Sequence, residues 1–230
     1  MLGIIGAMEE EVNELLALMD VKETKEDLGY TFHIGTLGNK ETVVVQGGIG
    51  KVNATVSCTL MIKNFNIDHL INIGTAGGLC QEEEVGDIVI GERVCHHDFD
   101  LTGFGRPMGR IPNLPEVYIH ANEDMVRVAQ EVLKDNDVRA HTGIIASGDQ
   151  FVHTNEQVDK ILTHFPEAMC AEMEAASIGQ TCYLFQVPFI ITRGLSDIFN
   201  KGNNSIQFDE YLKKASKVSA KMCYELAQKL

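Results

Sequence analysis

The segment Met169-Cys170-Ala171-Glu172-Met173-Glu174-Ala175-Ala176 sets two carboxylates in a run of small and apolar residues. If residues 169–173 form a strand, Glu172 and Glu174 point toward the same face, close to the start of a helix. A buried carboxylate needs a hydrogen bond or an opposite charge. The alternative is a frayed strand end with both acids in solvent. We favour burial, because another acid, Asp197, ends the next strand-like run.

Acids that end two strands indicate a ligand site at the carboxyl edge of a sheet. Strand-like runs and helical patterns mostly alternate along the chain, which favours an α/β fold. We predict a single domain, residues 1–230, with three layers, α-β-α, around a central mixed sheet. Strands are expected at 2–6, 30–35, 42–46, 68–74, 86–100, 142–147, 169–173 and 187–193, helices at 9–19, 51–65, 122–136, 154–165, 174–185 and 208–230, a small-residue turn at 74–78 and a long loop at 101–116.

The composition restricts the partners and the compartment. The 230 residues carry a formal net charge of -14. Nucleic acids and anionic membranes bind basic surfaces, so this charge argues against both as partners. Six scattered cysteines without a C-x-x-C pair indicate reduced thiols in the core. We find neither a signal peptide nor an apolar run long enough to span a membrane, and we expect a cytoplasmic protein.

Three short motifs carry little weight alone. The turn Gly47-Gly48-Ile49-Gly50-Lys51 lacks the spacing of a phosphate loop, and we interpret it as a strand-to-helix turn whose backbone donors face a ligand. On one strand His96, Asp98 and Asp100 would share a face, but further metal ligands are missing. Gly194-Leu195-Ser196 is similar to a nucleophile elbow without its second glycine. We predict neither a metal nor an organic cofactor.

Seven segments follow one another in a specific order: Gly3-Ile4-Ile5-Gly6-Ala7-Met8-Glu9-Glu10-Glu11, Gly48-Ile49-Gly50-Lys51-Val52, Gly74-Thr75-Ala76-Gly77-Gly78, Gly86-Asp87-Ile88-Val89, Ser147-Gly148-Asp149, Glu172-Met173-Glu174-Ala175 and Ser196-Asp197. Together they resemble the nucleoside phosphorylase and nucleosidase superfamily, and specifically its 5′-methylthioadenosine/S-adenosylhomocysteine nucleosidases. Thr75 stands where a serine is common in that family, and it keeps the hydroxyl.

This resemblance implies a hydrolase of methionine salvage that cleaves the N-glycosidic bond of 5′-methylthioadenosine, S-adenosylhomocysteine and 5′-deoxyadenosine. It implies that Glu11 activates water, Glu174 binds the ribose hydroxyls and Asp197 protonates adenine N7. The implied substrate-binding residues are Met8, Ile49, Thr75, Ala76, Gly77, Phe151, Val152, Glu172, Met173, Arg193, Ser196 and Phe208, together with Phe104 and Pro112 from the neighbouring subunit of a homodimer. Among them, we expect Thr75, Glu172 and Arg193 to support the residues that touch the substrate, and the alternative for Arg193 is an ion pair that neutralises a buried acid.

The chemistry of the residues agrees with this implication. Breaking a ribosyl C–N bond builds positive charge on the sugar, and nearby carboxylates stabilise that charge. A protonated purine is also a better leaving group. Asp197 must then hold a proton near neutral pH, which requires burial or a neighbouring acid to raise its pKa.

Two other functions stay open at this point. A purine nucleoside phosphorylase would share the fold but needs cations for phosphate, for which Arg93, Arg106, Arg110 and Arg193 are available. A nucleoside-binding protein without activity could use the same scaffold. The acid-rich turn at 9–11 favours water activation, so we prefer the hydrolase. The sequence does not fix the 5′-substituent, and a futalosine-type nucleoside is a further candidate.

Overall fold

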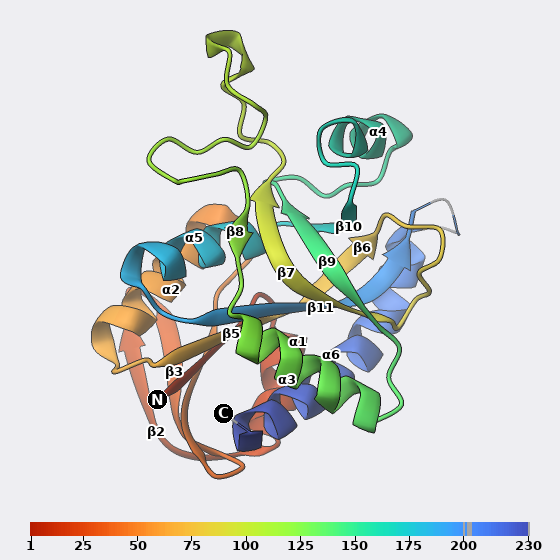
Figure 1. The fold of residues 1–230 in the computed structure, drawn as a ribbon. Coiled ribbons are helices and arrows are strands. Elements are labelled where there is room, and N and C mark those ends of the chain that lie inside the picture. The colour runs from red at the N-terminus through yellow and green to blue at the C-terminus, as the bar shows by residue number, and fades with distance from the viewer. Residues whose placement is uncertain (200, 202–203, 230) are drawn as a thin grey trace.

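Helices cover both faces of a twisted central sheet (Figure 1). The computed structural model describes residues 1–199, 201 and 204–229, without the side chains of 204–210, 213 and 214. The side chain of Phe208, a predicted site residue, therefore lies outside the described part of the chain.

The described strands form one sheet in the order β2-β3-β4-β1-β5-β11-β6-β10-β9-β7-β8, and β11 also pairs with β7. The strands are β1 (Leu2–Gly6), β2 (Met19–Asp27), β3 (Tyr30–Leu37), β4 (Lys40–Gln46), β5 (His69–Ile73), β6 (Thr75–Gly78), β7 (Ile88–His96), β8 (Ile119–His120), β9 (Ala140–Ser147), β10 (Ala168–Glu172) and β11 (Phe189–Ile198). The helices are α1 (Glu9–Leu16), α2 (Lys51–Asn64), the 3₁₀ helix η1 (Thr102–Phe104), α3 (Glu123–Asp135), α4 (Asn155–His164), α5 (Ala175–Phe185) and α6 (Asn204–Lys229).

The sheet is mixed, as predicted. β1 pairs in parallel with β4 and β5, and β11 pairs in parallel with β5 and β6. β2, β3 and β4 form successive antiparallel hairpins, and β10 runs antiparallel to β6. The parallel strands β1, β5 and β11 bring their carboxyl ends to one edge of the sheet.

Alternating side chains along the strands build a core on each face of the sheet. In β1, Ile5 packs into a cluster with residues of α2 and α5, whereas Ile4 packs into a cluster with residues of α1, α3 and α6. This division confirms the predicted three-layer α-β-α fold. The six cysteines are free thiols, and five of them are buried, as predicted.

The predicted helix 9–19 is wrong at its end. α1 stops at Leu16, and Met19 begins β2, a strand that we did not predict. Met19 is buried in the same cluster as Val12 and Leu15, so its burial fits helical spacing equally well. Its pairing with Leu37 in β3 decides the conformation, and that contact is not visible in the local pattern.

Two further predictions are corrected around the centre of the sheet. The predicted turn at 74–78 contains β6, because its small residues pair with β11 on one side and β10 on the other. β11 extends to Ile198 and not only to Arg193, so Ser196 and Asp197 lie inside a strand. A nucleophile elbow needs a sharp turn after the strand, so Ser196 does not lie in one, and this agrees with the missing second glycine.

Arg193 ties three strands together beneath their carboxyl ends. Its side chain is 1% exposed and is the largest fully buried one among the described residues. The guanidinium donates from Nε and Nη2 to Glu172 Oε2 of β10, at 3.1 and 2.6 Å. Nη2 also donates to Asn72 Oδ1 of β5 at 2.6 Å. Burial opposes the charged guanidinium, but Glu172 and Glu174 outweigh it and raise the pKa of Arg193.

We expect Arg193→Met to lower the free energy of unfolding by about 3–5 kcal/mol, because it leaves the buried Glu172 carboxylate without its opposite charge. Urea denaturation measures this loss. The double variant Arg193→Met/Glu172→Gln removes both charges and should recover much of it. A loss below about 1 kcal/mol in the single variant would contradict the structural role of the ion pair.

Candidate active site

The carboxyl ends of β1, β10 and β11 border a cavity of about 340 Å³. A smaller recess of about 40 Å³ adjoins it and shares Gly77, Phe151 and Asp197 as lining residues. Most of the predicted site residues line the cavity: Met8, Glu11, Ile49, Thr75, Ala76, Gly77, Phe151, Glu172, Met173, Glu174, Ser196 and Asp197. Val152 lines the recess. Residues from across the chain therefore meet at one place.

Some lining residues were not predicted. Ala7, Gly74 and Ala171 also border the cavity, and Gly78, Leu79, Gln150, Val158 and Phe199 border the recess. Most of them are direct neighbours of predicted site residues in the sequence. Their position beside those motifs is the signal that could have identified them.

Glu11 occupies the first turn of α1, directly after β1. It is 1% exposed, and its Oε2 accepts hydrogen bonds from the backbone N–H of Ala7 at 2.7 Å and Met8 at 3.0 Å. Its Oε1 accepts from the N–H of Thr75 at 3.2 Å. Burial raises the pKa of Glu11, while these donors and the nearby Arg193 oppose the shift. The carboxyl group is thus fixed at the cavity wall in a site that suits a general base.

Glu172 and Glu174 both reach the cavity, but not as neighbours on one strand. β10 ends at Glu172, and Glu174 precedes the first turn of α5. The Glu172 carboxylate accepts from the N–H of Glu174 at 3.0 Å and of Ala175 at 2.9 Å, so it neutralises the start of α5 as well as Arg193. Burial, followed by the charge of Glu172, raises the pKa of Glu174 to about 7.

Asp197 is 2% exposed near the end of β11. Burial raises its pKa to about 6, and the Ser196 hydroxyl, which donates to Oδ1 at 2.9 Å, opposes that shift. On the other side, a Cβ atom at Gly77 would lie 3.3 Å from Oδ2, so a side chain there would crowd the carboxyl group. Asp197 therefore retains a proton over more of the pH range than an ordinary aspartic acid.

The backbone donors of the 47–51 turn are used by the protein itself. The N–H of Gly50 donates to Glu174 Oε1, and the N–H of Lys51 donates to Asp149 Oδ1, both at 2.8 Å. The expectation that these donors face a ligand is wrong for both groups. Carboxylates neutralise the start of α2, and in return that helix end holds Glu174 in place.

The Ser147-Gly148-Asp149 segment supports the site from behind. The Ser147 hydroxyl donates to Glu172 Oε1 and accepts from the N–H of Ala176 at 2.8 Å. A Cβ atom at Gly148 would lie 2.3 Å from Nε2 of the buried His97, so a larger residue would force the imidazole to move. These supporting contacts were not predicted, because they join residues that are distant in the sequence.

Three of the predicted residues that the structure describes line neither the cavity nor the recess, and two of them, Phe104 and Pro112, were predicted for the site of a neighbouring subunit. Arg193 is buried behind Glu172 and has no place in its lining. Phe104, in η1, is 84% exposed, and Pro112 is exposed on the same long loop. This loop projects from the body of the molecule as the yellow-green segment in Figure 1.

The metal hypothesis at 96–100 is wrong in its geometry. β7 ends at His96, so His96, Asp98 and Asp100 do not share a strand face. His96 bonds Gln180, and Asp98 accepts from the Lys51 ammonium and the N–H of Asp149. Within the described residues, no group of three or more His, Cys, Asp or Glu side chains could hold a metal ion.

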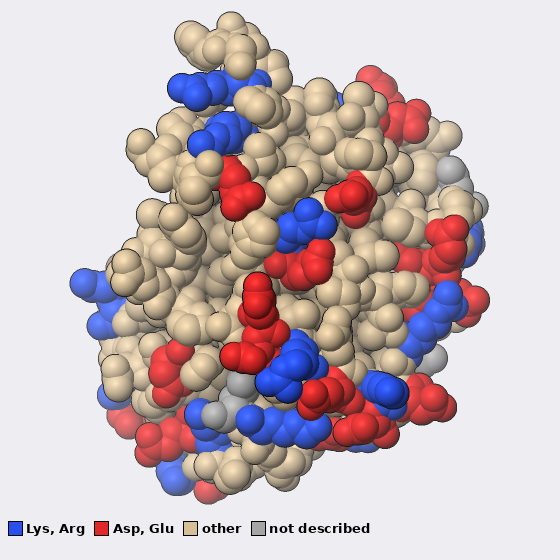
Figure 2. All heavy atoms as spheres, viewed as in Figure 1, with Lys and Arg blue, Asp and Glu red and all other residues tan. Residues whose placement is uncertain are grey.

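The surface carries charges of both signs. Figure 2 shows acidic and basic side chains interspersed on one face, in a chain with 33 acidic and 19 Lys or Arg residues. Among the helices that the structure describes, none has the length and apolar character needed to cross a membrane.

Comparison with known proteins identifies the family of the chain. The model of the phosphorylase superfamily matches residues 1–228. A 5′-methylthioadenosine/S-adenosylhomocysteine nucleosidase of Exiguobacterium is 44% identical, over 99% of this chain and 97% of its own length. The crystal structure of such a nucleosidase from Neisseria meningitidis, in complex with methylthio-immucillin-A, has a TM-score of 0.95 at 39% identity, covering 100% of this chain and 99% of its own.

A Helicobacter pylori mutant enzyme with 5′-methylthioadenosine in its active site has a TM-score of 0.94 at 33% identity, covering 100% of this chain and 98% of its own. These matches extend over the whole fold and include all the strands that border the cavity. The chain therefore belongs to the phosphorylase superfamily and, within it, to the 5′-methylthioadenosine/S-adenosylhomocysteine nucleosidases.

Proposed function

We propose that this nucleosidase hydrolyses the N-glycosidic bond of 5′-methylthioadenosine and S-adenosylhomocysteine, and also of 5′-deoxyadenosine, and releases adenine. The observation that carries the proposal is that Glu11, Glu174 and Asp197 line one cavity from three separate elements. A nucleoside in that cavity would have acids on the sugar side and a buried acid on the base side. The names of the full-length relatives support 5′-methylthioadenosine and S-adenosylhomocysteine as substrates, and 5′-deoxyadenosine is proposed by its likeness to them.

Asp197 is the proposed general acid. Its raised pKa, about 6, keeps a fraction of the carboxyl protonated near neutral pH. The Ser196 hydroxyl hydrogen-bonds Oδ1 of Asp197. We assign the other oxygen, Oδ2, which faces Gly77, to proton delivery at adenine N7. Adenine then leaves as a neutral base. Phe151 and the Val152 backbone border the adjoining recess, which suits stacking on adenine and contact with its edge.

Glu11 is the proposed general base that takes a proton from the attacking water. As the C–N bond breaks, the ribosyl group becomes cationic, and Glu174 and Glu11 stabilise that charge. Glu174 also binds the ribose hydroxyls in this proposal. Met8, Ile49 and Met173 give the cavity an apolar side that suits a thioether.

We expect Asp197→Asn and Glu11→Gln each to lower kcat by about 10²- to 10⁴-fold, because neither amide can transfer the proton in question. Chromatographic measurement of free adenine from 5′-methylthioadenosine tests this. Circular dichroism spectra like that of wild type serve as the control for folding. Wild-type turnover by either variant would remove the role assigned to that residue.

Hydrolysis fits the cavity better than phosphorolysis. No Lys or Arg is among the described residues that line the cavity, and Arg193 behind it is already paired with Glu172. Arg93 pairs with Glu92, and Arg110 donates to backbone carbonyls. A phosphate dianion would therefore meet carboxylates in place of cations.

The reaction is accordingly expected to proceed at the same rate with and without phosphate, and to yield the free 5′-substituted ribose. Mass spectrometry of the sugar product in phosphate and in a non-phosphate buffer at equal ionic strength makes the comparison. A ribose-1-phosphate product would establish the phosphorylase instead.

We also propose a homodimer in which Phe104 and Pro112 of one copy complete the site of the other. Large apolar side chains are exposed on the layer formed by α2 and α5, with Val52 72% and Leu184 65% exposed. Phe104, on the projecting loop, is 84% exposed. Surface apolar groups of this size suggest an interface. The free thiols support a reducing cytoplasm as the location.

A mixing experiment tests the shared site. Phe104→Ala should lower kcat/KM by about tenfold or more, since an aromatic anchor at an interface is commonly worth this much. Exchange of subunits between equal amounts of Phe104→Ala and Asp197→Asn protein should restore about a quarter of wild-type activity, because half of the dimers then hold one intact site of two. No recovery after verified exchange would exclude a site shared in this way.

A further inference from the structure

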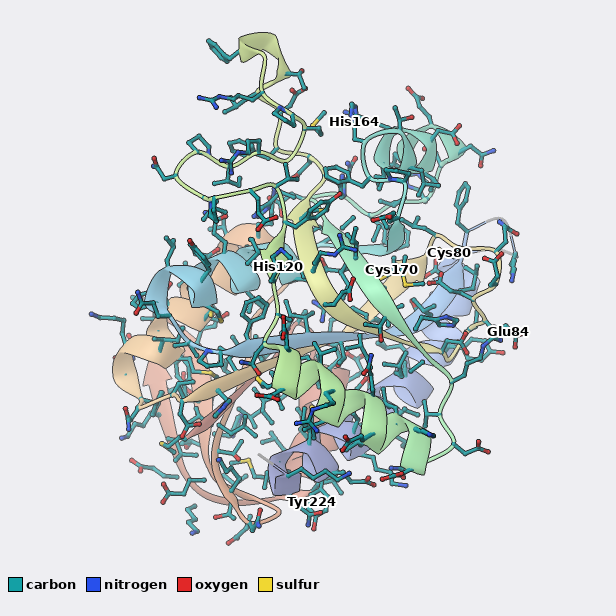
Figure 3. The ribbon with its side chains drawn as sticks, viewed as in Figure 1. Cys80, Glu84, His120, His164, Cys170 and Tyr224 are labelled. Atoms are coloured by element: carbon teal, nitrogen blue, oxygen red, sulfur yellow. The ribbon has the colours of Figure 1, made fainter. Side chains whose placement is uncertain are left out.

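Glu83 is a buried acid that the proposed reaction does not use. It belongs to the 79–87 loop between β6 and β7, where Cys80 and Glu84 also lie (Figure 3). Its side chain is 0% exposed. Oε2 accepts from the N–H of Cys80 at 3.0 Å, and Oε1 has no hydrogen-bond partner among the described residues. A buried carboxylate with one unsatisfied oxygen is costly, so the neutral acid is the form that fits.

The same loop holds the part of β11 that carries Asp197. Before Asp197, Leu195 exchanges backbone hydrogen bonds with the N–H of Gly86 and the carbonyl of Asp87, both at 2.8 Å. After it, the ammonium of Lys201 donates to the carbonyl of Glu83 at 2.8 Å and also to that of Gln81. The loop therefore forms hydrogen bonds with residues before and after Asp197, the proposed general acid.

The carboxyl group of Glu83 packs against Gly78 of β6, a residue that lines the recess. A Cβ atom at Gly78 would lie 2.7 Å from Glu83 Oε2 and 2.6 Å from Cδ1 of Ile198, so both groups contact this point of β6. The preceding residue, Gly77, faces Asp197 Oδ2 on the opposite side of the strand. Glu83 and Asp197 thus lie on opposite sides of the same short strand.

Among the described residues, no ion pair involves the Glu83 carboxyl group, and the Lys201 ammonium donates to the backbone carbonyl of Glu83 at 2.8 Å. On the same loop, the Asp87 carboxylate contacts two nearby basic side chains: His141 of β9 lies 2.8 Å from it, and Arg139 lies 3.5 Å from it. The thiols of Cys80 and Cys170 lie close by. Burial raises the pKa of Glu83 to about 7, the N–H of Cys80 and His141 oppose the shift, and Asp87 adds to it.

We propose that Glu83 is a positioning residue for Asp197. While Glu83 is a neutral acid, it holds β6 and β11 in the catalytic arrangement, and when Glu83 ionises, that arrangement is lost. The proposal rests on the assignment of Asp197 as general acid. An unpaired carboxylate at this place would draw in water or move toward solvent. Gly78, Leu195 and Ile198 would then shift, and Asp197 with them.

The pH profile of kcat/KM tests this role. In wild type two acids must keep their protons, so log(kcat/KM) should fall with a slope approaching about -2 above pH ~8. In Glu83→Gln, Asp197 is the only one of these two acids that can still lose a proton, so the slope should be about -1. The change should appear in kcat more than in KM, since the general acid and not the binding surface is displaced. A slope unchanged from wild type would overturn the proposal.

Glu84→Gln is the matched control. Glu84 lies on the same loop, is exposed and pairs with Arg139 at 3.3 Å, so this variant should keep the wild-type slope. If Glu83→Gln does not fold, Glu83→Met fills a similar volume and makes the same prediction. Loss of the steep slope in Glu84→Gln as well would also count against Glu83.

Thermal unfolding gives a second measurement. The pKa of Glu83 is raised in the folded state from 4.5 to about 7, so its contribution to stability is complete below pH 4.5 and is lost as the pH rises toward 7. As the pH rises from 4.5 to about 7, the Tm of Glu83→Gln should therefore increase relative to the Tm of wild type. A constant difference in Tm would contradict an ionising Glu83.

The Asp197→Asn variant separates the two proposals. If it stays inactive while Glu83→Gln keeps the wild-type slope, the Glu83 proposal fails and that for Asp197 stands. If Asp197→Asn turns over like wild type, both fail.

Discussion

The ion pair between Arg193 and Glu172 is the interaction on which the site depends. It is buried in the centre of the sheet and joins β10 to β11, while Asn72 extends the contact to β5. Its second effect is electrostatic. The charge of Arg193 lowers the cost of keeping the buried carboxyl groups of Glu11 and Glu174 near one another. Without this cation, the acids at the carboxyl edge would repel one another across the cavity.

Backbone N–H groups at the starts of helices offset the negative charge of the carboxylates, and no cation enters the described lining of the cavity. Glu11 accepts backbone N–H groups where β1 turns into α1, Glu174 accepts one at the start of α2, and Glu172 accepts two where β10 turns into α5. Backbone donors and helix dipoles therefore hold the carboxylates in place. The cavity therefore keeps Glu11, Glu172 and Glu174 in its lining, and carboxylates of this kind would stabilise the cationic transition state of the proposed reaction.

The sequence was sufficient where local patterns agree with tertiary contacts. Most strands and helices, the three layers and the convergence of Glu11, Glu172 and Asp197 were predictable from apolar periodicity, from the position of acids at strand ends and from the family resemblance. β2 was not, because its side chains are mostly exposed and only its hairpin pairing with β3 defines it as a strand. β6 was not, because its pairing partners β10 and β11 are distant in the sequence. The carboxylates that accept from the backbone donors of the 47–51 turn were missed because Glu174 and Asp149 lie about a hundred residues or more away.

Glu11 and Asp197 differ in what opposes the effect of their burial, and this difference supports their proposed roles. Burial raises the pKa of Glu11, but three backbone N–H groups that hydrogen-bond its carboxylate and the nearby Arg193 oppose that shift. Asp197 has burial opposed only by a single hydroxyl, and its pKa rises to about 6. Within one cavity, Glu11 is thus surrounded by several groups that favour its ionised form and Asp197 by a single one, which is the kind of difference that the proposed base and the proposed acid need.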